Sequence, residues 1–197
     1  MEPNGHETGR QAEPLHPWER LSTRVIHETQ WLKLREDKVR THAGAELTMT
    51  YTDKPGSVFV VPLLPTGEVV LIRQYRYMVD EWCWEVPSGG AEGRDPAFAA
   101  AAELREEIGG TAGALVPIGA FYFLVGGSNQ RATAFLARDV VLGEVEHEPG
   151  ELLYPVVMPF AEALALARAG AITDGPSALA LLLAEGHVNA NANHAAQ

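Results

Sequence analysis

The first third of the chain alternates apolar and polar residues with a period of two, a pattern typical of half-buried β-strands. Three stretches have this alternation: residues 23–29, 32–40 and 47–53. An Ala-Gly-Ala turn at residues 43–45 separates the last two and predicts a hairpin. We therefore expect a small antiparallel sheet near the N-terminus.

Longer apolar runs follow and predict buried strands, which lie at residues 57–64, 68–75, 81–86, 115–125, 132–136 and 152–158. Two apolar segments that begin at proline and end at glycine predict helices over residues 159–170 and 176–186. A further helix is predicted between the strands, at residues 95–110. Strands on both sides of a central helix, with more helices near the C-terminus, indicate an α/β fold with a mixed sheet.

The central helix has clear start and stop residues. Asp95 fits the N-cap, and Pro96 fits the first helical position, where the missing N–H of proline costs nothing. Gly109 and Gly110 form a left-handed stop at the other end. Apolar residues recur at helical spacing and predict the face that packs on the core: Ala97, Ala101, Leu104 and Ile108.

Three carboxylates share another face of this helix, because Glu103, Glu106 and Glu107 are spaced i, i+3 and i+4. A solvated helix face is the ordinary interpretation of such a cluster. However, the helix follows a glycine-rich loop at residues 88–90, and glycines let a backbone approach a ligand closely. Like charges at this spacing repel, and a divalent cation held by oxygen ligands would turn that repulsion into a bridge.

Composition narrows the classes of function. The 197 residues carry 15 Lys and Arg against 26 Asp and Glu, a net charge of −11 that argues against a nucleic-acid surface. An anionic substrate would then need local arginine or bound metal. The single cysteine, Cys83, fits a reducing cytoplasm, and no apolar run reaches membrane-spanning length. We expect a soluble cytoplasmic protein that binds no membrane.

The run from Gly89 to Gly109 resembles the box of the Nudix hydrolase superfamily, G-x5-E-x7-R-E-U-x-E-E-x-G-U. Its E-U-x-E-E core is intact at residues 103–107. Two departures stand beside it. Ala102 replaces the arginine that precedes the first glutamate of this core. The spacing from Gly89 is one residue short, so Arg94 or Asp95 stands where the box has its early glutamate.

Stretches outside the box are similar to the ADP-ribose pyrophosphatase branch of the family, at residues 31–35, 60–63, 73–76 and 84–89. The resemblance implies a Nudix-type α/β/α sandwich with a mixed sheet. It implies an N-terminal sheet at 18–56 and a Nudix domain at 57–188. It also implies a homodimer in which the strands of residues 25–51 are exchanged. The polar, Pro- and Gly-containing start predicts a disordered tail at 1–17, and the low-complexity end predicts a flexible tail at 189–197.

The resemblance also implies a metal site for Mg²⁺ or Mn²⁺. Glu103 and Glu107 would be ligands, Glu106 would share the cluster, and the carbonyl of Ser88 would be a further ligand. The same carboxylates that crowd one helix face would then be the hard oxygen donors that such cations prefer.

Substrate contacts follow from the resemblance as well. Arg76 would bind phosphate, and Glu85 would lie near the terminal ribose or the metal. Trp31 would stack on adenine, although a buried or interface tryptophan is an equal alternative. Arg73 is a further candidate for the substrate, with an ordinary strand-edge charge as its alternative.

A late-loop carboxylate would position or deprotonate the attacking water. Glu151 is the first choice and Glu148 the second, and both have the alternative of simple solvated loop acids. Glu106 is the third residue predicted to act in catalysis.

The predicted function is metal-dependent hydrolysis of the pyrophosphate bond of ADP-ribose or a related nucleoside diphosphate sugar, giving AMP and ribose 5-phosphate. One alternative is a Nudix-fold nucleotide-binding or regulatory module with little turnover, which Ala102 and the shortened loop favour. Another is a pyrophosphatase for a different nucleoside diphosphate derivative.

Overall fold

The structure is a computed structural model that describes residues 17–30, 32–145 and 152–194, without the side chains of 189–194. Contacts divide the chain into two compact units, residues 1–53 and 54–197.

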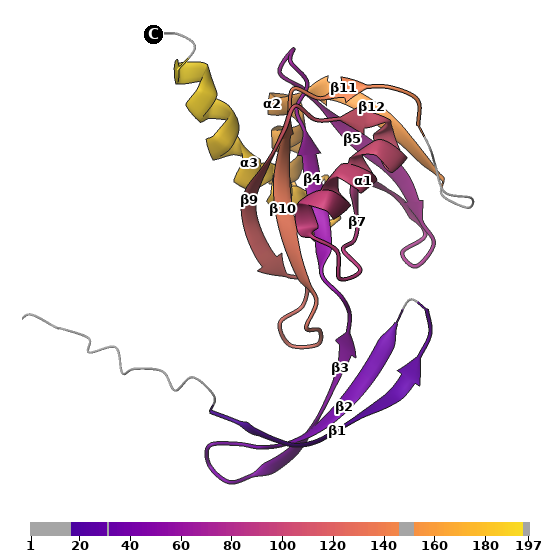
Figure 1. The fold of residues 1–197 in the computed structure, drawn as a ribbon, viewed down its shortest axis with the longest axis vertical. Coiled ribbons are helices and arrows are strands. Elements are labelled where there is room, and N and C mark those ends of the chain that lie inside the picture. Colours follow the sequence, from indigo (N-terminus) through magenta and orange to yellow (C-terminus); the bar gives the residue numbers. More distant parts are fainter. Residues whose placement is uncertain (1–16, 31, 146–151, 195–197) are drawn as a thin grey trace, which may run out of the picture. The chain divides into compact units, whose positions relative to one another are not determined.

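The N-terminal unit is a three-stranded antiparallel sheet with the strand order β1-β2-β3 (Figure 1). The strands are β1 (Glu19–Glu28), β2 (Lys33–Arg40) and β3 (Glu46–Asp53). The backbone closes the β2–β3 hairpin through a 2.8 Å hydrogen bond from Thr41 N to Ala45 O, with Gly44 at a φ of +83°. The predicted small antiparallel sheet is confirmed.

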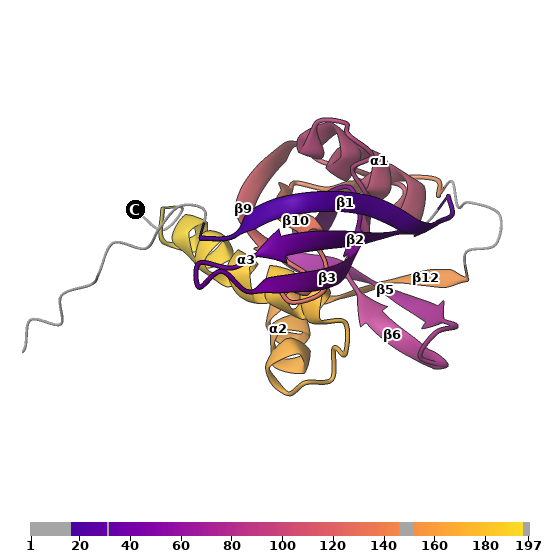
Figure 2. The same cartoon turned by 90° about the horizontal axis from the view of Figure 1, so that it is seen from below.

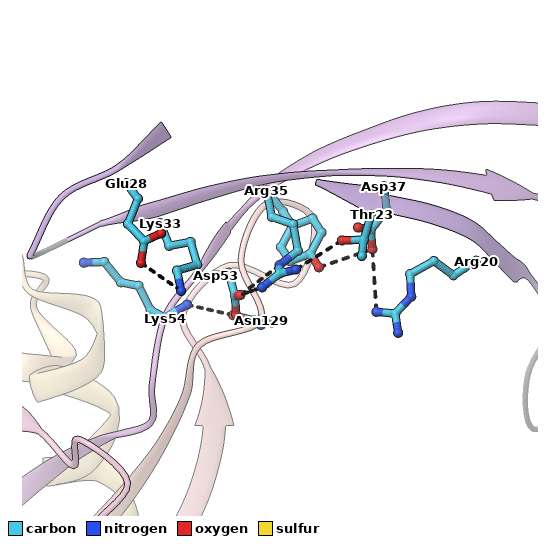
Figure 3. Close-up of polar contacts among 10 residues, drawn as sticks. Arg20, Thr23, Glu28, Lys33, Arg35, Asp37, Asp53, Lys54 and Asn129 are labelled. Atoms are coloured by element: carbon cyan, nitrogen blue, oxygen red, sulfur yellow. Dashed lines mark hydrogen bonds and ion pairs between the residues drawn. The ribbon is translucent and has the colours of Figure 1, made fainter. Parts of the chain in front are cut away.

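Charged and polar pairs join the strands of this sheet (Figure 3). Arg35 donates from Nε and Nη2 to one Asp53 carboxylate oxygen at 2.9 and 2.7 Å. The Tyr51 hydroxyl donates to Asp37 at 3.2 Å, and burial together with the nearby Asp37 charge raises the pKa of Tyr51. Asp37 is only 7% exposed, and its second carboxylate oxygen has no hydrogen-bond partner among the described residues.

The larger unit contains a mixed four-stranded sheet of order β7-β4-β10-β9. The central pair, β4 and β10, is parallel, and the outer pairs are antiparallel. These strands are β4 (Ser57–Pro62), β7 (Ser88–Gly90), β9 (Ala114–Tyr122) and β10 (Arg131–Arg138).

A second, antiparallel sheet of order β12-β5-β6 packs in the same unit. Its strands are β5 (Glu68–Arg76), β6 (Glu81–Glu85) and β12 (Leu153–Pro159), and a short pair forms between β8 (Gly110–Thr111) and β11 (Val141–Leu142). The strands β4, β5, β6, β9, β10 and β12 follow the predicted apolar runs closely, whereas β7, β8 and β11 were not predicted as strands.

Helices cover two faces of the sheets, and Figure 2 shows α1 and α2 on opposite sides. The helices are α1 (Pro96–Ile108), α2 (Phe160–Arg168) and α3 (Gly175–His194). Alternate residues of β4 point to different cores, since Val58 and Val60 pack with α1 while Phe59 and Val61 pack with α2 and α3. The predicted α/β/α arrangement with a mixed sheet is confirmed.

The ends of α1 are those that the sequence predicts. The Asp95 carboxylate accepts hydrogen bonds from Ala97 N at 2.9 Å and Phe98 N at 3.2 Å. Gly109 ends the helix in the left-handed region, with a φ of +65°, and its N–H bonds back to the Arg105 carbonyl. These caps satisfy backbone groups that have no partner within the helix.

Two details of the helices differ from the predictions. Ala101, predicted to face the core, is exposed, because the buried arc of α1 is wide and leaves only a narrow outer stripe with Phe98 and Arg105. Helix α3 does not end at Gly186 but continues to His194. Glycine inside a helix costs only about 1 kcal/mol relative to alanine, so it does not by itself end a helix.

Removing the α1 cap should destabilise the protein. We expect Asp95→Ala to lower the free energy of unfolding by about 1 kcal/mol, because two backbone donors lose their acceptor. Urea unfolding followed by circular dichroism measures this difference. Asp95→Asn keeps an oxygen acceptor and serves as the control; equal stability of the wild type and Asp95→Ala would contradict the capping role.

Candidate functional site

The glycine strand β7 lies directly against a carboxylate of α1. A Cβ atom built on Gly89 would stand 2.0 Å from Glu103 Oε1 and 2.2 Å from Glu103 Cδ, distances that real side chains do not adopt. Only glycine therefore leaves room for the Glu103 carboxylate on this stretch of backbone. The predicted close approach between the glycine loop and the carboxylate helix is present.

A second carboxylate meets the adjacent residue of the same strand. Glu107 is 5% exposed, and its Oε2 accepts a 2.9 Å hydrogen bond from Ser88 N. The structure thus brings together three of the predicted metal ligands, Ser88, Glu103 and Glu107. Glu106 is half-buried on the flank of this group, and its carboxylate lies 3.6 Å from an Arg105 guanidinium nitrogen.

The donors gathered here suit a hard divalent cation. Two carboxylates one helical turn apart repel each other in a partly buried setting, and the glycine cradle gives backbone close access to them. Oxygen donors of this kind are those that Mg²⁺ and Mn²⁺ prefer. In the described part of the chain, no three His, Cys, Asp or Glu side chains converge tightly enough to form a ready-made metal cluster.

An arginine–glutamate pair adjoins the carboxylates. Arg76, at the end of β5, donates to both oxygens of Glu85, at the end of β6, over 2.8 and 2.5 Å. Glu85 is 4% exposed, whereas 41% of the Arg76 side chain is accessible. The hydrogen bond to Glu85 raises the pKa of Arg76, with smaller contributions from the charges of Glu107 and Asp174. The pair therefore lies within electrostatic reach of the carboxylate helix.

Arg73 does not join this group. In the β5–β6 ladder it pairs with Trp84, and its guanidinium carbon lies 4.7 Å from the centre of the Trp84 ring. Because side chains alternate across a strand, Arg73 and Arg76 point to opposite faces of β5. The period of two could have separated these two arginines from the sequence alone.

The remaining predicted site residues, Trp31, Glu148 and Glu151, lie outside the described residues.

Sequence reasoning missed several contacts that hold the glycine loop. Arg94 donates to the carbonyls of Gly90 at 3.1 Å and Ala91 at 3.3 Å, so a cation fixes the loop close to the position where the Nudix box has its early glutamate. On the other side of the central strand, Gln130 Nε2 donates to Ser57 Oγ at 2.7 Å. The departure at Arg94 was visible in the sequence, but its hydrogen bonds to the loop were not.

Comparison with known families settles where the chain belongs. A model described as "NUDIX domain" matches residues 53–179, which is more than half of the chain. The chain belongs to the Nudix family. A second model, described as "Nucleoside diphosphate sugar hydrolase N-terminal domain", matches residues 18–48, within the N-terminal sheet.

Curated relatives place the chain in one branch of the Nudix hydrolases. An "ADP-ribose pyrophosphatase" from Mycobacterium tuberculosis is 30% identical over 149 residues, 72% of each chain. A protein of the same name from Bacillus subtilis is 32% identical over 130 residues, 64% of this chain and 70% of the relative. The chain is thus a Nudix pyrophosphatase of the ADP-ribose pyrophosphatase-like branch.

The fold agrees with this placement. A crystal structure described as an "ADP compounds hydrolase" superposes with a TM-score of 0.79 at 17% identity, covering 91% of this chain and 98% of the other. None of the helices in residues 17–30, 32–145 and 152–194 combines the length and apolar character needed to cross a membrane.

The contact between Gly89 and Glu103 gives a sharp test of the site. Gly89→Ala would place a methyl group where the Glu103 carboxylate lies, so we expect turnover to fall by about 10²-fold with the protein still folded. Steady-state hydrolysis and the midpoint of thermal unfolding measure the two effects.

Gly90→Ala is the matched control, because its Cβ would make an ordinary 3.5 Å contact with Glu92 Cγ. Equal activity of the two alanine variants would show that the Glu103 carboxylate need not lie on β7.

Proposed function

We propose that this Nudix enzyme hydrolyses the pyrophosphate bond of ADP-ribose or a related nucleoside diphosphate sugar, giving AMP and ribose 5-phosphate. The observation that carries the proposal is the arrangement of Glu103 and Glu107 of α1 against the glycine strand, with Glu107 within electrostatic reach of Arg76. The names of the two curated relatives and of the matching N-terminal family model support the choice of substrate.

The carboxylates would hold Mg²⁺ or Mn²⁺. Glu103 and Glu107 are the central ligands in this proposal, Glu106 joins from their flank, and the Ser88 carbonyl is the backbone ligand. Bound divalent cations neutralise the charge of a diphosphate and lower the pKa of a water molecule. Ser88 N already binds Glu107, and this hydrogen bond fixes the distance between the strand and the ligands on the helix.

Arg76 would bind a phosphate oxygen. A guanidinium has five N–H donors, and Glu85 occupies the Nε and Nη2 groups in a two-point contact. Other donors of the exposed part of the side chain remain to meet an anion. Buried Glu85 thereby orients Arg76 before the substrate arrives, which lowers the entropy lost on binding.

Other residues complete the proposal. Glu151, or in second place Glu148, would act as general base toward the attacking water, with Glu106 as a further catalytic carboxylate. Trp31 would stack on the adenine. Arg73 stays a prediction for substrate binding, although it stacks on Trp84 on the face opposite Arg76.

We further propose that the protein acts in the cytoplasm as a homodimer in which the sheet of β1, β2 and β3 reaches the partner. The match of that sheet to an N-terminal family model of nucleoside diphosphate sugar hydrolases supports a role for it beyond the Nudix domain.

The central test is the loss of a proposed metal ligand. We expect Glu107→Gln to lower turnover by about 10²-fold or more, because the charge is lost, while the amide oxygen still accepts from Ser88 N and preserves the fold. The measurement is chromatographic detection of AMP from ADP-ribose and Mg²⁺, with and without a chelator. Glu162→Gln, exposed on α2, is the matched control.

Activity of Glu107→Gln near that of the wild type would contradict the ligand assignment. Wild-type protein that leaves ADP-ribose intact would contradict the proposed reaction. A binding titration with ADP-ribose and a panel of nucleoside diphosphate derivatives would then separate a nucleotide-binding module from a pyrophosphatase of different specificity.

A further inference from the structure

A fully buried hydroxyl lies behind the candidate site. Ser177, in the first turn of α3, is 0% exposed, and its Oγ accepts a 3.1 Å hydrogen bond from Val86 N. The two residues are 91 positions apart in the chain. Val86 is itself fully buried and immediately precedes Pro87 and the glycine strand. The contact therefore links the start of a distant helix to the backbone that leads into the site.

Asp174 determines the direction of this hydroxyl. The Ser177 hydroxyl donates to Asp174 Oδ2 at 2.5 Å, and a carboxylate can only accept. Because serine has a single O–H proton, the lone pairs of Oγ are left to face Val86 N. The arrangement is a short relay in which a side-chain oxygen at the start of α3 orients an acceptor for one specific backbone N–H.

The segment that this relay holds connects the two halves of the site. Glu85 binds Arg76 through its side chain, and Ser88 binds Glu107 through its N–H. Between them, Val86 N meets Ser177, and the Pro87 carbonyl accepts a 2.8 Å hydrogen bond from Val60 N in β4. Four successive residues are thus fixed by β5, α3, β4 and α1 in turn.

We propose that Ser177 and Asp174 are positioning residues for the reaction, which act by holding the segment 85–88 so that Arg76–Glu85 and Ser88–Glu107 keep their separation. The effect on catalysis rests on the proposed function. The hydrogen bonds from which the inference is argued are independent of that function. Removing a group that orients the ligands of a metal site through hydrogen bonds commonly lowers metal affinity by about 10-fold or more.

The relay is separable from the ordinary capping of α3. Asp174 caps the helix with two different oxygens: Oδ2 accepts from Ser177 N at 3.0 Å, and the main-chain carbonyl accepts from Ala178 N at 3.0 Å. Neither bond involves the Ser177 hydroxyl. Ser177→Ala removes only the hydroxyl and places a strong helix former in the first turn. Asp174→Asn keeps a side-chain oxygen that can accept from the Ser177 hydroxyl and from Ser177 N, and it leaves the main-chain carbonyl that binds Ala178 N unchanged.

Two measurements test the proposal without relying on turnover. The first is the hydrogen-exchange rate of the Val86 amide by NMR, and the second is the dissociation constant of Mn²⁺ by electron paramagnetic resonance. For Ser177→Ala we expect exchange at Val86 to become about fivefold faster and Mn²⁺ binding to weaken about 10-fold. For Asp174→Asn we expect both values to stay within about twofold of the wild type.

Leu164→Val, in the core beneath α2, is the control for a general loss of stability. We expect it to leave the Mn²⁺ dissociation constant unchanged and to speed exchange at Val86 no more than at other core amides. Unchanged exchange and unchanged Mn²⁺ affinity in Ser177→Ala would overturn the proposal. So would a loss in Asp174→Asn as large as that in Ser177→Ala, because the charge of Asp174 would then matter rather than the orientation of the hydroxyl.

A wild type that binds Mn²⁺ but releases no AMP from ADP-ribose would contradict the proposed function alone. The Val86 exchange rate, which needs neither metal nor substrate, would still decide whether the relay holds the segment.

Discussion

The close approach between β7 and α1 is the constraint on which the rest of the larger unit depends. Without a Cβ at Gly89 the Glu103 carboxylate reaches the strand, and the next residue back, Ser88, binds Glu107. This contact requires α1 to lie at a fixed height above the sheet. Val58 and Val60 of β4 set that height, because they pack with Leu104 on the underside of the helix. Packing in the core therefore sets the geometry of the site.

The alternation of β4 explains why the unit has two cores and one site. Val58 and Val60 face the core under α1, while Phe59 and Val61 face the core under α2 and α3. The same strand pairs with β7, so the glycine strand also lies where the two cores meet. Groups from both layers can then reach its backbone: Glu107 from α1 and, two residues earlier at Val86, Ser177 from α3.

Local patterns predicted the elements well, because the physics that forms them is local. Asp95 and Gly109 fixed the ends of α1, the period of two placed the N-terminal strands, and apolar runs placed the longer strands of the larger unit. Patterns predicted less well what depends on several elements at once. The exposure of Ala101 depends on how many elements surround α1, and the Ser177–Val86 bond joins segments 91 residues apart. The opposite faces of Arg73 and Arg76 were accessible from their spacing, but the resemblance to a family motif drew both into one predicted site.

The departures from the Nudix box become intelligible in physical terms. Ala102 stands where the box has arginine, and it is only 5% exposed, so this side of α1 is closed by packing rather than by a charged side chain. The loop before the helix is one residue shorter, and Arg94 holds it through the carbonyls of Gly90 and Ala91. A hydrogen-bonded guanidinium restrains a short glycine loop that would otherwise have many accessible backbone conformations. Order in the loop therefore comes from a cation beside the helix start, while Glu103 and Glu107 lie against β7.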